Sequence, residues 1–220
     1  RQFVQIADPQ LGFCDKGQDW RWTVDNLKVT VARVNELKPA FVIVTGDLIH
    51  NHKSAEQARA YRENIALIDA SIPVFHIPGN HDNDGATPAG AGVDRRAEHL
   101  YRRTFGPTYY AMNIGDVHWI MMDNIIYKNT PGKGKKNVGV VGARDYDKGF
   151  TPEQLAWLRR DLATVDASKT VCLCTHCPVF FDRDRRTLLT DRSQVDSLDA
   201  LFSRFERVHI FSGHAHRTVS

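Results

Sequence analysis

Short runs rich in β-branched residues alternate with longer segments of helical periodicity, and this alternation constrains the fold more than any other feature. The runs at 3–7 and 41–45 flank a segment with apolar residues at every third or fourth position: Val24, Leu27, Val31 and Val34. That spacing is typical of one face of a helix, here ending near Pro39, whereas the almost wholly apolar run 41–45 suits a strand covered on both faces. The sequence therefore predicts an α/β domain.

The same patterns continue toward the C-terminus. Thr151-Pro-Glu-Gln is a helix start with proline in the first turn, and Gly115-Asp116 is a turn signal inside a hairpin. The segments 83–94 and 127–149 are predicted to be loops, the second lying near the site. Further strands are predicted at 74–77, 109–114, 117–123, 170–175 and 208–212, and further helices at 54–69, 95–105, 151–162 and 193–205.

Composition excludes several classes of protein. The 220 residues carry 29 Lys+Arg and 26 Asp+Glu, a net charge of only +3, so no broad nucleic-acid-binding face is expected. A mean hydropathy of −0.40 and the absence of a long apolar run indicate that no segment spans a membrane. Three of the four cysteines crowd into residues 172–177, where neighbours pair with difficulty, which favours a reducing, cytoplasmic compartment. Export stays open because no Met precedes Arg1.

Polar side chains that can bind metal follow the ends of five predicted strands. In open α/β sheets this edge is where ligands bind. The donors are carboxylates, amides and imidazoles without a thiolate, which suits Mn²⁺, Fe or Zn²⁺ better than Ca²⁺ or a structural zinc. Seven donors exceed those of one catalytic ion, whereas two divalent ions sharing a carboxylate would use them all. The donors are Asp8, Gln10, Asp47, Asn80, His176, His214 and His216.

In order and spacing, these motifs resemble the calcineurin-like metallophosphoesterase superfamily over nearly the whole chain. The motifs are Asp8-Pro-Gln10, Gly46-Asp47, Gly79-Asn-His-Asp82, His176 and Gly213-His-Ala-His216. Gln10 departs from the family pattern, in which most members have His. The chain is similar in this respect to a branch that uses Asp-Pro-Gln and includes a Ser/Thr phosphoprotein phosphatase. The resemblance implies a four-layer α-β-β-α sandwich with mixed sheets.

The resemblance also implies a role for each site residue. Asp47 would bridge the two metal ions, which would hold the water or hydroxide that attacks phosphorus. His81 would protonate the leaving alkoxide, and Asp82 would orient His81. Gln10 would be a weaker donor than the histidine that most members have, because an amide oxygen binds metal less strongly than imidazole and cannot become a charged ligand. The first ion would be completed by Asp8, Gln10 and His216, and the second by Asn80, His176 and His214.

Two groups of residues allow a second interpretation. Cys172, Cys174 and Cys177 surround His176 and could form a zinc site, but core thiols are the expected arrangement because no second cysteine pair exists. His50 and His52 follow the Gly-Asp motif, and we expect either that one of them reaches the phosphate or that they lie in a solvated loop.

The function expected from the sequence is that of a metal-dependent phosphoesterase, most directly a phosphomonoesterase. The alternatives are a phosphodiesterase of cyclic nucleotides, nucleotide-linked metabolites or lipid head groups, and a catalytically dead scaffold. Residues 1–220 are expected to form a single catalytic domain that lacks C-terminal strands or belongs to a longer chain, because the sequence stops four residues after His216. The sequence does not predict an oligomeric state.

Overall fold

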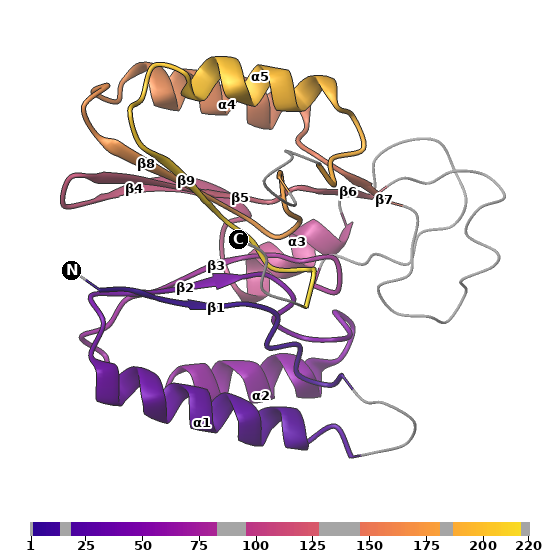
Figure 1. Cartoon of the computed structure of the whole chain (residues 1–220). Helices are drawn as coiled ribbons and strands as arrows, with labels where there is room; N and C mark the ends of the chain where they lie inside the picture. Colours follow the sequence, from indigo (N-terminus) through magenta and orange to yellow (C-terminus); the bar gives the residue numbers. More distant parts are fainter. Residues whose placement is uncertain (1, 14–18, 83–95, 128–145, 181–186, 217–220) are drawn as a thin grey trace, which may run out of the picture.

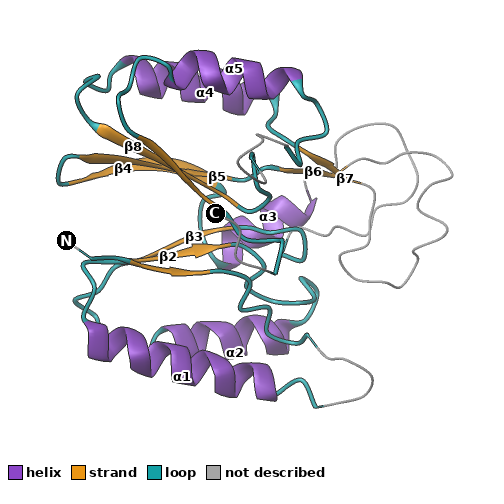
Figure 2. Ribbon diagram, viewed as in Figure 1, coloured by secondary structure: helices purple, strands orange, loops and turns teal. Residues whose placement is uncertain are grey.

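Two β-sheets face each other, and a pair of helices covers the outer face of each (Figures 1 and 2). This is the expected four-layer α/β arrangement. The computed structural model describes residues 2–13, 19–82, 96–127, 146–180 and 187–216. None of the helices in these ranges is long and apolar enough to cross a membrane.

The first sheet has the order β1-β2-β3 with all neighbours parallel, and its outer face is covered by α1 and α2 (Figure 1). Ser54 is the N-cap of α2 as expected, since its side-chain oxygen accepts a hydrogen bond from the backbone N–H of Gln57. The elements are β1 (Val4–Ile6), α1 (Trp22–Leu37), β2 (Val42–Thr45), α2 (Ala55–Ile65) and β3 (Val74–Ile77).

The second sheet is mixed and has the order β4-β5-β8-β9. β4 pairs antiparallel with β5 across the predicted Gly115 turn, while β8 pairs parallel with both β5 and β9. Thr151 starts α4 with a capping box to Gln154. The elements are α3 (Arg96–Thr104), β4 (Tyr109–Ile114), β5 (Val117–Met122), α4 (Pro152–Ala163), β8 (Thr170–Thr175), α5 (Ser193–Phe202) and β9 (Val208–Phe211).

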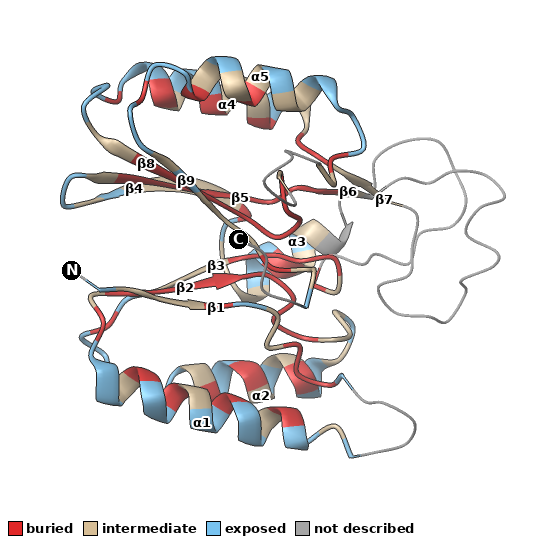
Figure 3. Ribbon diagram, in the orientation of Figure 1, coloured by how far each residue is buried: buried red, intermediate tan, exposed pale blue. Residues whose placement is uncertain are grey.

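Apolar residues alternate between the two faces of each central strand. On β2, Val42 and Val44 pack toward α1 and α2, while Ile43 joins the core between the sheets. Figure 3 shows β2 as buried throughout. On β8, Cys172 and Cys174 likewise lie between the sheets, as expected for core thiols. Burial raises the pKa of the Cys172 thiol to about 12, so this group stays a thiol.

One predicted loop contains strand residues. The segment 127–149 is expected to be a surface loop, yet β6 (Ile125–Tyr127) pairs antiparallel with β7 (Tyr146–Lys148). The loop prediction is therefore wrong at residues 127 and 146–148, because pairing with Ile125–Tyr127 makes a strand of a segment whose Asp147 and Lys148 have low strand propensity. The predicted loops at 83–94 and 128–145 lie outside the described residues.

Candidate metal centre

The candidate ligands lie where the chain leaves the strands, and their backbone is unusual. Among the described residues, six non-glycine residues have positive φ, and five of them are candidate ligands. The sixth, Lys38, ends helix α1. Non-glycine residues in the left-handed region store strain of about 1–3 kcal/mol each, and such residues cluster at functional sites. The five are Asp8 (φ 50°), Gln10 (41°), Asp47 (51°), His214 (66°) and His216 (48°).

Glycines let these turns approach one another closely. A Cβ on Gly46 would lie 2.5 Å from His176 Nδ1, and a Cβ on Gly213 would lie 2.5 Å from Asp8 Oδ2. A Cβ on Gly79 would overlap the Asp47 carboxylate and backbone nitrogen. Gly46, Gly79 and Gly213, which precede ligands in three of the five motifs, are therefore needed for the ligands to converge.

Three candidate ligand atoms form a tight group. Asn80 Oδ1 lies 3.1 Å from His176 Nε2 and 3.0 Å from His214 Nδ1, and the two ring nitrogens are 3.3 Å apart. His176 Nδ1 must donate its proton to the carbonyl oxygen of Thr45, 2.9 Å away, because a carbonyl only accepts. In the neutral ring, Nε2 therefore turns a lone pair toward the Asn80 oxygen. Two acceptors at this distance favour a cation between them.

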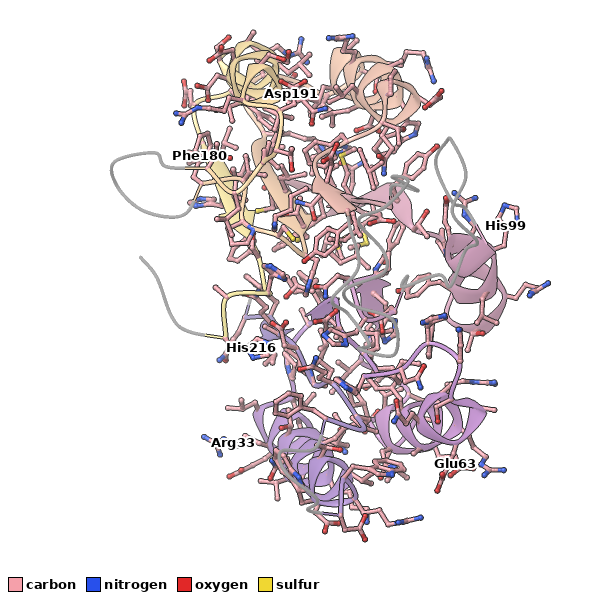
Figure 4. The ribbon with its side chains drawn as sticks, turned by 90° about the vertical axis from the view of Figure 1, so that its right-hand side faces the viewer. Arg33, Glu63, His99, Phe180, Asp191 and His216 are labelled. Atoms are coloured by element: carbon pink, nitrogen blue, oxygen red, sulfur yellow. The ribbon has the colours of Figure 1, made fainter. Side chains whose placement is uncertain are left out.

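Two carboxylates lie beside this group. Asp47 Oδ1 is 3.5 Å from His176 Nε2, and one ligand atom each from Asp8, Asp47 and His176 lie within 4.8 Å of one another. The backbone N–H of His214 donates to both Asp8 oxygens, at 3.0 and 2.9 Å. His216 Nε2 lies 3.5 Å from Asp8 Oδ1 on the segment after β9, between the two halves of the sandwich (Figure 4).

The electrostatics of the site also favour a cation. Burial raises the pKa of Asp47 to about 7, and the nearby Asp8 charge adds to this rise. Burial lowers the pKa of His214 to about 3, and the neighbouring His176 acts in the same direction. A bound cation would stabilise the ionised form of the Asp47 carboxylate, which burial disfavours. The neutral imidazole of His214 is already in the form that binds metal.

The spacing of the donors fits a metal ion. Ligands about 2.0–2.1 Å from an ion, at angles between octahedral and tetrahedral, lie about 2.9–3.4 Å apart. The three distances within the group of Asn80, His176 and His214 fall in this range. A carbonyl partner for the second ring nitrogen, as Thr45 provides, is the usual way in which a metal-binding histidine is oriented. The residues present therefore fit divalent metal.

Gln10 is buried and lies next to the carboxylates. Its backbone N–H donates to the Asp47 carbonyl at 2.8 Å. Its side-chain Nε2 lies 3.5 Å from Nδ1 of His50. Burial lowers the pKa of His50 to about 4, so the ring is neutral and Nδ1 accepts this bond. The amide nitrogen thus faces His50, which leaves the amide oxygen as the atom free to bind a metal.

The environment of Asp82 differs from the expected one. His81 Nδ1 donates to the backbone carbonyl of His50 at 2.8 Å. The Asp82 carboxylate, which is buried, accepts backbone N–H bonds from Leu48 and Ile49 at 3.1 Å and from Gly79 at 2.8 Å. The prediction that Asp82 orients the His81 ring finds no support in this geometry, because the contacts of the described residues join that carboxylate to three backbone amides and not to the ring. Asp82 instead ties the loop after β3 to the loop after β2.

The sequence leaves open whether His50 reaches the phosphate or lies in a solvated loop. Its ring stacks on His81 with centroids 4.6 Å apart and an interplanar angle of 28°. It is neither fully solvated nor remote from the site. Its position three residues after Asp47 was the only signal, and spacing alone does not give the direction of a side chain.

Known protein families and individual proteins resemble this chain in sequence. The model of the calcineurin-like phosphoesterase family matches residues 1–218. The chain is 27% identical over 237 residues to the serine/threonine-protein phosphatase CPPED1 of Homo sapiens, covering 99% of this chain and 69% of that protein. It is 26% identical over 223 residues to a probable glycerophosphodiester phosphodiesterase, GpdQ, of Arcobacter nitrofigilis, covering 97% and 71%.

Solved structures share the fold. A dimetal phosphatase from Danio rerio has a TM-score of 0.65 at 16% identity, covering 98% of this chain and 81% of that one. A purple acid phosphatase from yellow lupin (Lupinus luteus) seeds has a TM-score of 0.66 at 15% identity. The match covers 98% of this chain but only 38% of the lupin chain. With its ligand motifs, its sandwich fold and a family match over almost all its residues, the chain belongs to the calcineurin-like phosphoesterase family of phosphate-ester hydrolases.

Proposed function

We propose that this protein is a phosphomonoesterase that uses two divalent metal ions. One observation carries the proposal: candidate metal ligands meet at the strand ends. The ligand atoms of Asn80, His176 and His214 lie 3.0–3.3 Å apart, and the carboxylates of Asp8 and Asp47 lie beside them. Asp47 has a ligand atom within 4.8 Å of one from Asp8 and one from His176, so it would be the carboxylate that both ions share. Bound metal supplies positive charge to phosphate oxygens and activates the attacking water.

The chain's own residues supply the remaining chemistry. His81 lies beside the carboxylate, since its backbone N–H donates to Asp47 Oδ1 at 2.9 Å. Its Nδ1 is committed to the His50 carbonyl, so Nε2 is the atom from which a protonated ring gives its proton to a leaving alkoxide. Asp82 keeps the His81 loop in place through the three backbone amides.

A phosphodiesterase is the second candidate. It is favoured by similarity to the GpdQ relative, which is named as a probable glycerophosphodiester phosphodiesterase and is 26% identical to the chain, against 27% for the phosphatase. The same donors serve either reaction, because the difference lies in what surrounds the second ester group.

Hydrolysis of paired substrates tests the proposal. We expect turnover of p-nitrophenyl phosphate in the presence of Mn²⁺, no turnover after chelation, and recovery when Mn²⁺ is restored. Turnover of bis-p-nitrophenyl phosphate well above that of the monoester supports the second candidate. Absence of turnover with either ester and with Mn²⁺, Fe²⁺ or Zn²⁺ contradicts both.

A further inference from the structure

The loops after β1 and β2 are joined by backbone hydrogen bonds beyond the strands themselves. Leu11 N–H donates to the Leu48 carbonyl at 3.1 Å, and His50 N–H donates to the Leu11 carbonyl at 2.8 Å. Leu11 and Ile49 form a parallel bridge, and both are buried. The backbone of His50 is therefore held by the same ladder that carries the candidate ligands Gln10 and Asp47.

The His50 ring is enclosed by three neighbours. On one side it stacks on His81. The ring of Phe13 meets it nearly at right angles, with centroids 5.7 Å apart. Gln10 Nε2 lies 3.5 Å from Nδ1. A ring held by an aromatic edge and an amide has little freedom to rotate, so the face that it offers to His81 is fixed.

His81 depends on His50 twice. The backbone carbonyl of His50 accepts the Nδ1 proton at 2.8 Å, and the ring of the same residue covers one face of the His81 imidazole. These contacts fix the rotation of the His81 ring and the nitrogen that is left to act on substrate. The Asp82 carboxylate, in contrast, bonds to backbone amides in the described part of the chain.

We infer that His50 is a positioning residue, whose ring holds His81 in the one orientation from which it protonates the leaving group. The inference rests on the proposed function for its kinetic consequence. It assigns His50 neither a direct phosphate contact nor a place in a solvated loop.

Kinetics with two leaving groups test the inference. We expect His50→Ala to lower kcat for an alkyl phosphate by about 10- to 100-fold, the usual effect of misplacing a catalytic group. KM should change little, and the loss with p-nitrophenyl phosphate should be much smaller, because that leaving group needs no proton. His50→Phe keeps a flat ring against His81 and should recover most of the lost kcat. His99→Phe, which changes an exposed histidine on α3, is the matched control (Figure 4).

A double-mutant cycle separates positioning from general damage. If His50 acts through His81, adding His50→Ala to His81→Ala should cost nothing further. Losses that add in full, or that are equal for both leaving groups, overturn the inference.

Imidazole NMR of the metal-free protein gives a readout that does not need activity. We expect one His81 tautomer, protonated at Nδ1, in the wild type and in His50→Phe, and a mixture in His50→Ala. The His81 signals are identified by their loss in His81→Gln. An inactive wild type overturns the proposed function alone, while an unchanged His81 tautomer in His50→Ala overturns the inference alone. Should His50→Ala not fold, a mixed tautomer in His50→Phe overturns it as well.

Discussion

His176 donates its Nδ1 proton to the carbonyl oxygen of Thr45, 2.9 Å away, and so turns Nε2 toward Asn80 and Asp47. Thr45 ends β2 in the first sheet, and His176 follows β8 in the second. The first sheet therefore orients a candidate ligand that the second sheet carries. A metal held at this point joins the two halves of the sandwich, so metal affinity and stability are linked.

Replacing Asp47 with Asn should release at least one metal ion and abolish turnover. The carboxylate lies 3.5 Å from His176 Nε2 and accepts the His81 N–H at 2.9 Å, and an amide keeps the shape but not the charge. Metal content of the purified variant, measured by plasma mass spectrometry, checks this. Two retained ions together with normal turnover contradict the bridging role.

Ionisation of Asp47 should lower the unfolding free energy of the metal-free protein as the pH rises. Burial raises the pKa of Asp47 to about 7, well above the usual value for a carboxyl. Between about pH 4 and 7 the folded state holds a proton that the unfolded chain has released, so the unfolding free energy falls with increasing pH.

The pH dependence of the unfolding free energy is compared between wild type and Asp47→Asn. This comparison separates the contribution of Asp47 from that of carboxylates with lowered pKa values, which act in the opposite direction. Urea unfolding in chelator at pH 5 and pH 7.5 measures it. We expect Asp47→Asn to lose less stability than the wild type over this interval. An equal change in both proteins contradicts the assignment.

Much of this site follows from strand ends that are readable in the sequence. Phe41–Thr45 ends at Gly46-Asp47, and β-periodicity places that aspartate at the edge of the sheet. The position of His50 is not readable, because it depends on hydrogen bonds between Leu11 and the loop after β2. The orientation of Asp82 depends on amides from a different loop. Such contacts arise from tertiary packing, and local patterns carry no signal for them.

Asp82→Ala should destabilise the metal-free protein strongly. The buried carboxylate accepts N–H bonds from Leu48, Ile49 and Gly79, and each donor left unsatisfied costs about 1–3 kcal/mol. Asp82→Asn keeps one acceptor oxygen and should lose less. Urea unfolding of both variants in chelator tests the order. If Asp82→Asn alters the leaving-group dependence of turnover while stability is unchanged, Asp82 orients the His81 ring as the sequence predicts.

His216→Gly should be more stable than His216→Ala. The backbone of His216 has φ 48°, where a Cβ is strained by about 1–2 kcal/mol and glycine is not. Allowing for the greater chain entropy of glycine, we expect a difference of about 0.5–1 kcal/mol. Both variants lack the imidazole, so loss of a metal ligand is the same in each. His209, exposed on β9, is the control, and there Ala should be the more stable.

Gln10→His should change the metal preference of the site. The amide nitrogen of Gln10 faces His50 Nδ1 at 3.5 Å, which turns the amide oxygen away from His50, and the backbone of Gln10 is bonded to that of Asp47. If that oxygen binds the first ion, an imidazole supplies a softer and stronger donor, so Zn²⁺ should gain affinity relative to Mn²⁺. Competitive titration of the two metals against wild type and variant measures the ratio. The new ring also meets His50, so Gln10→Asn, which keeps the amide but shortens its reach, serves as the control. It should weaken the affinity for Mn²⁺ without favouring Zn²⁺. A Zn²⁺/Mn²⁺ ratio that is the same in all three proteins means that Gln10 does not bind the ion and serves only to hold His50.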